Sequence, residues 1–132
     1  MNIYKSSEDY LEAILALKER NGAVRSIDIV NELGYSKPSI SIAMKKLREN
    51  GYIEMDQTGY ITLTDAGREI AEKIYTRHRV LTKLLEYLGV DSKIAEEDAC
   101  KVEHDLSEET FMQLKKIYCK KVMAGDTFKI EE

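Results

Sequence analysis

The hydrophobic and polar positions of the first fifty residues predict three helices separated by two short breaks. Apolar residues recur every three to four positions from about residue 7 to residue 20, and Asn21-Gly22 ends this stretch. A shorter helix begins at its cap Ser26, and after a tight turn at Gly34-Tyr35 another begins at its cap Ser36. A short helix, a tight turn and a further helix in this order predict a helix-turn-helix.

The third of these helices has a basic exposed side. Residues 34–48 contain four basic residues and no acid. The whole chain carries a net charge of −4 and has a pI near 5.3, so attraction to nucleic-acid phosphate must come from a local patch of this kind. A run of lysines is often only a solvated face, but the helix-turn-helix context favours contact with DNA.

Each residue type in and around this patch suits one kind of DNA contact. Lysines hold phosphates, the serine hydroxyls at positions 39 and 41 reach base edges, and Ile42 packs against a thymine methyl. Arg25, Ser26 and the segment after the third helix are expected to contact the DNA backbone. The candidate DNA-binding residues are Arg25, Ser26, Ser36, Lys37, Pro38, Ser39, Ser41, Ile42, Lys45 and Lys46.

Two short strands and three more helices are predicted beyond the third helix. Residues 52–55 and 59–63 form strands around a turn at residues 56–59, which makes a wing. A long helix capped at Thr64-Asp65 ends at Gly89, the next is capped by Asp91 or Ser92, and the last starts at Ser107. The apolar side of the long helix is expected to hold Ile70, Ile74, His78, Leu81, Leu85 and Leu88. The apolar side of the helix that follows is expected to hold Ile94, Ala95, Ala99 and Val102.

The composition changes near residue 75 from mixed helix and hairpin to helix alone. The fold class is therefore mainly α, with a winged helix-turn-helix DNA-binding domain at residues 1–74 followed by an all-helical domain at residues 75–132. The last two helices bury too little apolar surface to be self-sufficient, so we expect a homodimer formed through the second domain. Twofold symmetry would place two recognition helices one turn of DNA apart, roughly 34 Å.

Length and composition restrict the class and the compartment. With 132 residues, 43% of them hydrophobic, the chain suits one ordinary core or a small domain with a helical extension. Two cysteines and no apolar, signal-like segment in the first seven residues predict a reducing cytoplasm, in which Cys100 remains a free thiol. No uninterrupted apolar run approaches the roughly 20 residues of a membrane span, so no membrane partner is expected.

Side chains of the types that bind metal ions occur in three separated segments. The candidate donors are Asp9 and Glu12 near the start, His78 in the long helix, and Cys100, Glu103 and His104 on one face of a later helix. Each type also has an ordinary explanation. A free cysteine is often a small core residue, acids in a first helical turn are stabilised by the helix dipole, and a histidine on an apolar side is usually a hydrogen-bonded core residue. The residues taken one by one leave both explanations open.

Five motifs along the chain carry a family resemblance. They are Ser7-Glu8-Asp9-Tyr10-Leu11-Glu12-Ala13-Ile14, Ser36-Lys37-Pro38-Ser39-Ile40-Ser41, Leu63-Thr64-Asp65-Ala66-Gly67, Arg77-His78-Arg79 and Glu97-Asp98-Ala99-Cys100-Lys101-Val102-Glu103-His104. In this order they resemble the diphtheria toxin repressor and manganese transport regulator family of metal-activated transcription repressors. The resemblance covers essentially the whole chain, and it implies that the second domain is a metal-binding and dimerisation domain.

The resemblance also implies which residues bind the metal, namely Asp9, Glu12, His78, Cys100, Glu103 and His104. Manganese-type members have acids at positions 9 and 12, as here, but Glu in place of Cys100. Iron-type members have Cys at position 100 but Met in place of Asp9, so this set of donors is a hybrid. Thr82 and Glu96 replace the ancillary ligands of the iron type, and no ancillary site of that kind is expected. In length the chain resembles the manganese type.

The expected function is that of a metal-activated DNA-binding repressor of metal-ion homeostasis. Its partners would be double-stranded operator DNA and a second copy of the chain, with no small organic substrate. Carboxylates favour Mn(II) and a thiolate favours softer ions, so Mn(II) or Fe(II) is the expected corepressor, and Co(II), Ni(II) or Zn(II) would bind in vitro. One alternative is a winged-helix regulator in which Cys100 is a redox switch. Another, a metal-dependent hydrolase, is less favoured because no Gly-rich phosphate cradle or lid segment is evident, so no enzymatic activity is expected.

Overall fold

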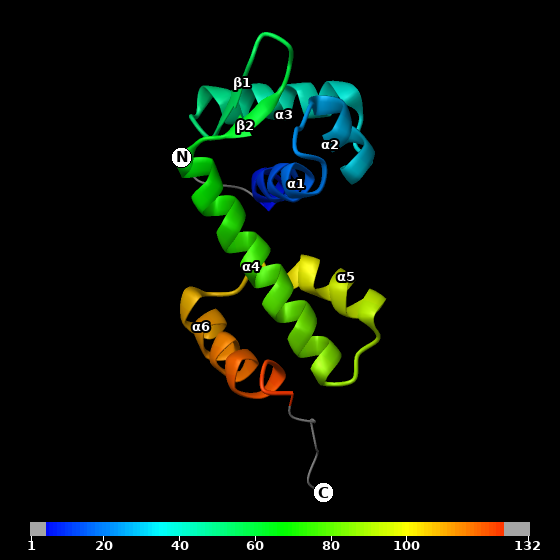
Figure 1. The fold of residues 1–132 in the computed structure, drawn as a ribbon, viewed down its shortest axis with the longest axis vertical. Coiled ribbons are helices and arrows are strands. Elements are labelled where there is room, and N and C mark those ends of the chain that lie inside the picture. Colours follow the sequence, from blue (N-terminus) through cyan, green and yellow to red (C-terminus); the bar gives the residue numbers. More distant parts are fainter. Residues whose placement is uncertain (1–4, 126–132) are drawn as a thin grey trace, which may run out of the picture. The chain divides into compact units, whose positions relative to one another are not determined.

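The computed structural model describes residues 5–125, which form two compact units (Figure 1). The boundary between the units falls after Lys73, within one long helix, and each unit is described here by itself. None of the helices in the described part of the chain is both long and apolar enough to cross a membrane. The fold is mainly helical with one small sheet, as the sequence predicted.

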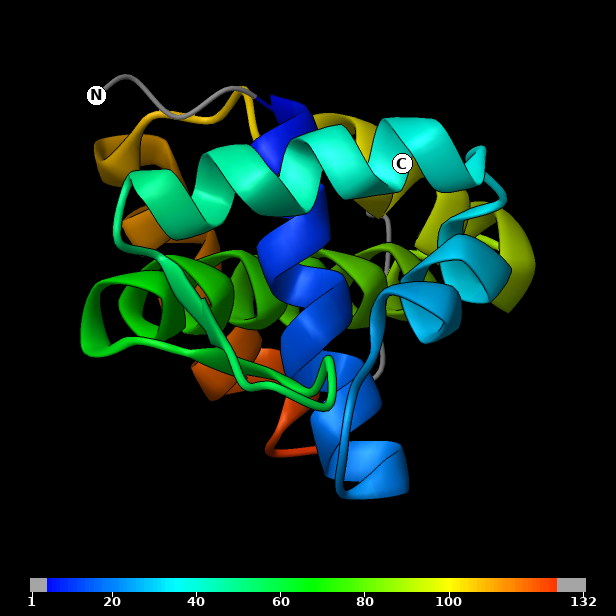
Figure 2. The same cartoon turned by 90° about the horizontal axis from the view of Figure 1, so that it is seen from above.

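The first unit is a three-helix domain with a β-hairpin. Its elements are α1 (Lys5–Asn21), α2 (Ser26–Leu33), α3 (Lys37–Glu49), β1 (Ile53–Met55), β2 (Ile61–Leu63) and the start of α4 (Asp65–Tyr87). Helix α2 packs against α1 and α3, β1 lies against α3 and β2 against α1 (Figures 1 and 2). The fully buried large side chains at the centre are aliphatic, and they include Leu11, Ile14, Ile29, Ile40 and Leu47. This is the predicted winged helix-turn-helix.

The helix-turn-helix differs from prediction at the start of α2. Arg25, and not Ser26, is the N-cap, and the Asp28 carboxylate accepts a hydrogen bond from the Arg25 backbone N–H at 2.8 Å. The reason is tertiary, because Arg25 has extended backbone geometry and forms a β-bridge with Tyr60 beside β2. At α3 the prediction is confirmed, since the Ser36 hydroxyl accepts the Ser39 N–H at 3.3 Å.

The wing is an antiparallel hairpin closed by a side chain. Ile53 pairs with Leu63 and Met55 with Ile61. In the turn, Asp56 Oδ1 accepts hydrogen bonds from the Thr58 hydroxyl at 2.7 Å and from the Tyr60 N–H at 2.9 Å. These hydrogen bonds lower the pKa of the exposed Asp56 carboxyl, and the bond from the Thr58 hydroxyl has the largest effect. The charged carboxylate therefore holds the turn in shape.

The junction between the wing and α4 depends on a close backbone approach. Thr64 caps α4, as predicted, by accepting the Gly67 N–H at 3.2 Å. A Cβ atom on Gly67 would collide with the Tyr52 carbonyl group. The first turn of α4 therefore lies directly against the chain that enters the wing, and only glycine fits at this position.

The second unit consists of helices alone. The remainder of α4 is followed by α5 (Ser92–Val102), α6 (Glu108–Ile117) and a one-turn π-helix, η1 (Tyr118–Val122). Asp91 and Ser107 cap α5 and α6 with their side chains. The core contains Val80, Leu84 and Phe111, against which Leu114, Tyr118 and Val122 pack.

Two parts of the predicted apolar pattern in this unit are wrong. On α5, Ala95 and Ala99 are buried as predicted, but Ile94 and Val102 are 51% and 42% exposed. On α4, Leu88 is 49% exposed, while Arg77, Val80 and Leu84 are buried. The reason is that α5 and α6 pack on different sides of α4, which widens the buried arc toward Val80 and Leu84 and leaves the end of the helix open.

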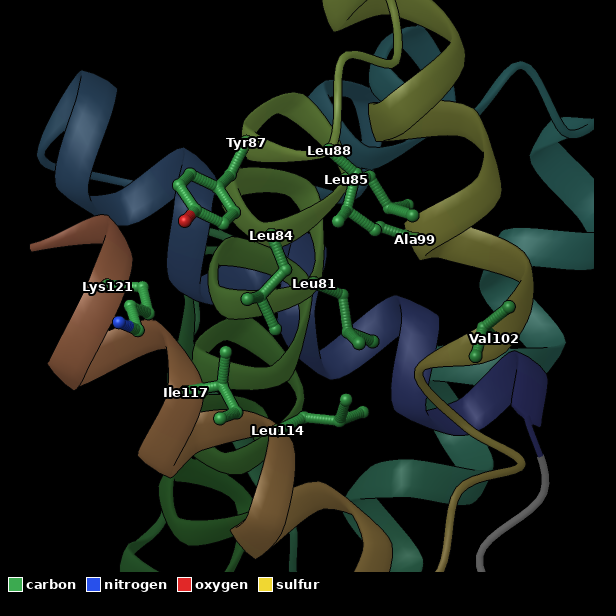
Figure 3. Close-up of a pocket in the computed structure, with 10 residues that line it drawn as sticks. All are labelled: Leu81, Leu84, Leu85, Tyr87, Leu88, Ala99, Val102, Leu114, Ile117 and Lys121. Atoms are coloured by element: carbon green, nitrogen blue, oxygen red, sulfur yellow. The ribbon is translucent and has the colours of Figure 1, made fainter. Parts of the chain in front are cut away.

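An apolar groove of about 640 Å³ opens on this unit. Figure 3 shows the α4 side chains lying between those of α5 on one side and those of α6 and η1 on the other. The lining residues include Leu85, Leu88, Val102 and Ile117. Leu85, Leu88 and Val102, which were predicted to lie on buried apolar sides, therefore line an open groove.

Candidate metal centre and DNA-binding face

Three of the predicted metal donors meet between α4 and α5. One ligand atom from each of His78, Cys100 and Glu103 lies within 4.8 Å of the other two. The Nδ1 of His78 is 2.8 Å from Glu103 Oε2 and 3.6 Å from the Cys100 Sγ. A thiol, an imidazole and a carboxylate at this spacing are a donor set for a divalent transition metal.

Local structure explains why these donors meet. Cys100 and Glu103 are one helical turn apart, so they share a face of α5, and Glu103 is the residue at which the helix ends. The small side chains of Ala95 and Ala99 are fully buried, which allows α5 to approach its neighbours closely.

Glu103 is the centre of the cluster and supplies the test of whether a metal fits. Its side chain is buried, and within the described residues its Oε1 has no hydrogen-bond partner. The Nε2 of His104 lies 3.4 Å from that oxygen. A buried carboxylate oxygen is costly unless it is paired or coordinates a cation, so the site fits a metal ion.

The protonation of His78 fits the same picture. The contact with Cys100, which has the largest effect, and the contact with Glu103 raise the pKa of His78 to about 10. Burial acts in the opposite direction. Without a metal ion, the imidazolium therefore supplies the positive charge beside Glu103. A metal ligand must be deprotonated, so a metal ion held by His78 would displace this proton.

Two of the other three predicted donors lie on a different unit. Asp9 and Glu12 are half-buried residues on α1 of the first unit. The assignment of all six residues as ligands stays a prediction. In the second unit the predicted residues His78, Cys100, Glu103 and His104 are brought together.

Arg77 lies beside this cluster, a placement that the sequence pattern did not predict. It is only 4% exposed, and its guanidinium donates hydrogen bonds to the backbone carbonyls of Glu103 and Leu106. A signal was available, because position 77 continues the spacing of Ile74 and Leu81. An arginine on that stripe has to satisfy its donors inside the fold.

The predicted DNA-binding face is exposed on α3. Ile42 is 59% exposed, and Ser39, Ser41, Lys45 and Lys46 are exposed as well. Lys37, Pro38 and Ser41 lie on the surface near the start of the helix, and a small groove of about 250 Å³ runs between α2 and α3 past Ser26 and Lys37. A solvent-facing row of this kind suits insertion into a DNA groove.

Three of the predicted contacts also have a structural role. The Ser36 hydroxyl caps α3 and donates to the Ser39 Oγ at 2.8 Å. The Arg25 guanidinium lies over the Tyr60 ring, 4.3 Å from its centroid, at the base of the wing. The DNA-binding roles of these residues stay predictions.

The fold and the donor cluster together define a class of protein, the winged helix-turn-helix regulators with a helical metal-binding domain. The profile of the iron dependent repressor N-terminal DNA binding domain matches residues 2–60. That of the iron dependent repressor metal binding and dimerisation domain matches residues 64–120. The chain belongs to the iron dependent repressor family, which confirms the resemblance inferred from the motifs.

Individual relatives agree with this assignment. An HTH-type transcriptional regulator of Methanocaldococcus jannaschii is 40% identical over 113 residues, which are 84% of this chain and 90% of that protein. The transcriptional regulator MntR of Listeria welshimeri is 33% identical over 102 residues, which are 77% of this chain and 72% of that protein. The family consists of transcriptional regulators.

Solved structures show the same fold. The manganese regulator SloR matches with a TM-score of 0.75 and 28% identity, over 92% of this chain and 56% of SloR. A manganese-dependent transcriptional repressor in complex with manganese matches with a TM-score of 0.76 and 28% identity, over 83% of this chain and 51% of its own. The chain therefore spans about half the length of these two structures.

Proposed function

We propose that this protein is a metal-activated DNA-binding transcriptional repressor that controls metal-ion homeostasis. The observation that carries the proposal is the meeting of His78, Cys100 and Glu103 in a helical unit that follows a winged helix-turn-helix. Similar solved structures named as a manganese regulator and a manganese-dependent transcriptional repressor support the physiological role. The residues proposed to hold the ion are Asp9, Glu12, His78, Cys100, Glu103 and His104.

We propose Mn(II) or Fe(II) as the corepressor. Carboxylates favour Mn(II), whereas the Cys100 thiolate favours Fe(II) and softer ions, and Co(II), Ni(II) or Zn(II) would bind in vitro. A bound divalent cation supplies positive charge that neutralises the carboxylates of the site. His78, once deprotonated, and Glu103, whose Oε1 has no hydrogen-bond partner among the described residues, would hold the ion.

The coupling between metal and DNA follows from where the donors lie in the chain. Asp9 and Glu12 belong to the DNA-binding unit, and the remaining donors belong to the helical unit. Without a cation, these acids repel one another, which opposes any arrangement that brings them together. Linkage then requires that DNA tighten metal binding by the factor by which metal tightens DNA binding, and a 100-fold effect corresponds to about 2.7 kcal/mol.

We propose that a second copy of the chain covers the apolar groove of the helical unit. The matched family domain is described as a dimerisation domain, and Leu88, Ile94 and Val102 present apolar surface on this unit. Sedimentation analysis should give a dimer for the unaltered chain and a monomer for Leu88→Glu. A dimer that survives this substitution would move the interface elsewhere.

The central test is DNA binding with and without metal. Duplexes selected from a random pool in the presence of Mn(II) serve as the probe, and affinity is measured with anaerobic Mn(II), Fe(II) or a chelator. We expect chelation to weaken binding by about 100-fold, and Glu103→Gln to abolish the metal response. Glu97→Gln, an exposed acid on the same helix, is the matched control. Equal affinity after chelation would refute the proposal.

A redox role for Cys100 is the second candidate, because the thiol is exposed and its Sγ lies 3.6 Å from an imidazole. The Cys100→Asp variant distinguishes a metal-ligand role of Cys100 from a redox role. If Cys100 is a ligand, the aspartate keeps a metal response, since a carboxylate also binds these ions. If Cys100 is an oxidation switch, the variant loses its response to peroxide and binds DNA independently of metal.

A further inference from the structure

We propose that Arg77 is a positioning residue of the metal centre, which acts by holding the end of α5 that carries Glu103. This inference rests on the proposed function, because it assumes that Glu103 binds the ion. Every residue involved lies in the helical unit.

The contacts of Arg77 converge on the turn between α5 and α6. Its Nη1 donates to the backbone carbonyl of Glu103 at 3.1 Å and to that of Leu106 at 2.7 Å. Its Nη2 donates to Glu108 Oε2 at 3.0 Å. The guanidinium also lies over the Phe111 ring, 5.1 Å from its centroid. The carbonyls at the end of a helix have no partners within the helix, so Arg77 serves as the cap of α5 from another element.

Two neighbouring residues of α4 thereby hold opposite ends of Glu103. Arg77 binds the main chain of Glu103, while His78 binds the side chain through Nδ1 at 2.8 Å. The position of the Glu103 carboxylate relative to His78 and Cys100 is therefore set by two consecutive positions of one rigid helix. If the main-chain contacts were lost, the end of α5 could unwind or turn, and the carboxylate would leave the 4.8 Å cluster.

Arg77 does not belong to the donor set, since a guanidinium carries no lone pair for a metal ion. Its effect has to pass through Glu103. Partners that orient the ligands of a metal commonly change its affinity by about 10- to 100-fold when they are removed. A purely structural role is the rival explanation, because Arg77 also joins α4 to α6 through Phe111 and Glu108. That role would change stability and leave the metal site of the folded protein as it was.

Cobalt provides the readout, because Co(II) bound to a thiolate has visible and near-ultraviolet absorption that reports its ligand geometry. The full chain is titrated anaerobically with Co(II) alone, and the thermal stability of each metal-free variant is measured in parallel. The variants are Arg77→Lys and Arg77→Met. Arg68→Met, an exposed arginine on the same helix, is the matched control, and Glu108→Gln removes the acid while it keeps both carbonyl contacts.

We expect Arg77→Lys to weaken Co(II) binding by about tenfold and to alter the absorption spectrum. Arg77→Met should bind Co(II) more weakly than Arg77→Lys does. Arg68→Met and Glu108→Gln should keep the spectrum of the unaltered chain. If Arg77→Met fails to fold, Arg77→Lys decides the matter, because lysine keeps the charge but loses the fork that reaches two carbonyls.

A double-mutant cycle with Glu103→Gln tests whether Arg77 changes the metal affinity through Glu103. Once the carboxylate is removed, Arg77→Lys should cause no further loss of Co(II) affinity, because both changes act through the same ligand. Additive losses, or a lowered melting temperature with unchanged affinity and spectrum, would overturn the positioning role. Failure of the unaltered chain to bind Co(II) would instead overturn the proposed function itself.

Discussion

The two units of the described chain bury different kinds of side chain. The first unit has large aliphatic side chains at its centre, such as Leu11, Ile14 and Ile40. The second unit contains both of the buried charged residues found among the described residues, Arg77 and Glu103, and it leaves Leu88 and Val102 exposed. The first unit therefore has a closed aliphatic core, whereas the helical unit buries charged side chains and leaves apolar surface exposed.

This difference explains how a ligand can control the protein. The core of the first unit consists of closely packed aliphatic side chains, so it does not need a bound ion to hold α3 and the wing in shape. The buried Glu103 carboxylate, whose Oε1 has no hydrogen-bond partner among the described residues, favours a state in which a cation binds there. The regulated property should therefore lie in the helical unit and the recognition surface in the other.

The largest expected effect concerns the DNA-binding unit. Gly67→Val should lower the free energy of unfolding by about 3 kcal/mol, because any side chain at this position collides with the Tyr52 carbonyl group. Thermal unfolding followed by circular dichroism measures it, and Ala66→Val, at an exposed neighbouring position, is the control. Wild-type stability of Gly67→Val would contradict the close packing of α4 against the wing.

The second prediction concerns the helical unit alone. Glu103→Gln should weaken Mn(II) binding by about 100-fold, or about 2.7 kcal/mol, because the buried carboxylate oxygen becomes a neutral amide. Titration calorimetry measures the affinity, and Glu97→Gln should bind as the unaltered chain does. If Glu103→Gln kept full affinity, the comparison between a closed unit and an ion-dependent unit would fail.

The pH dependence sharpens the same comparison. The pKa of His78 is raised to about 10 in the folded, metal-free protein, above the ordinary value near 6.5. Its stabilising contribution is therefore fully present below about pH 6.5 and is lost as pH rises through about 10. Metal competes with this proton, so metal affinity should rise at least tenfold per pH unit between pH 6 and pH 8, or about 1.4 kcal/mol.

Titrations of Mn(II) at several pH values in one salt concentration measure this slope. His78→Gln removes one titrating group, so it should lower the slope by about tenfold per pH unit while it weakens binding overall. An affinity that is constant with pH in the unaltered chain would show that His78 does not lose a proton when the metal binds.

The smallest expected effect concerns the exposed face of α3. Lys46→Gln should weaken DNA binding similarly for all sequences and reduce the slope of log affinity against log salt by about 1, because one phosphate contact is lost. Fluorescence anisotropy with Mn(II) at several salt concentrations measures the slope. Lys93→Gln, an exposed lysine on α5, should leave it unchanged.

Local patterns predicted most of the fold. Ile40, Met44 and Leu47, which are buried on α3, lie three to four residues apart, a spacing that is visible in the sequence. The caps Ser36, Thr64 and Ser107 lie where the sequence placed them. The donors Cys100 and Glu103 share a helix, so their proximity followed from helical geometry. Features with a period of one helical turn are visible in a sequence because they depend on neighbours along the chain.

Other features depended on elements distant in the chain. The Arg25 cap replaced Ser26 because Arg25 pairs with Tyr60 beside β2. Ile94 and Val102 appeared to be core residues because the pattern shows that a side is apolar but not whether another helix covers it. Arg77 went unassigned because its partners Glu103 and Leu106 are 26 and 29 residues away.

The sequence by itself determined the order of helices, the wing, the basic exposed side of α3 and the family to which the chain belongs, because each is encoded in short motifs or local periodicity. Only the tertiary structure decided that His78 reaches Glu103 and Cys100, and that Arg77 holds the turn in which Glu103 lies. Those contacts require the packing of separate helices, and burial, which gives Glu103 its need for a cation, is a property of the assembled core.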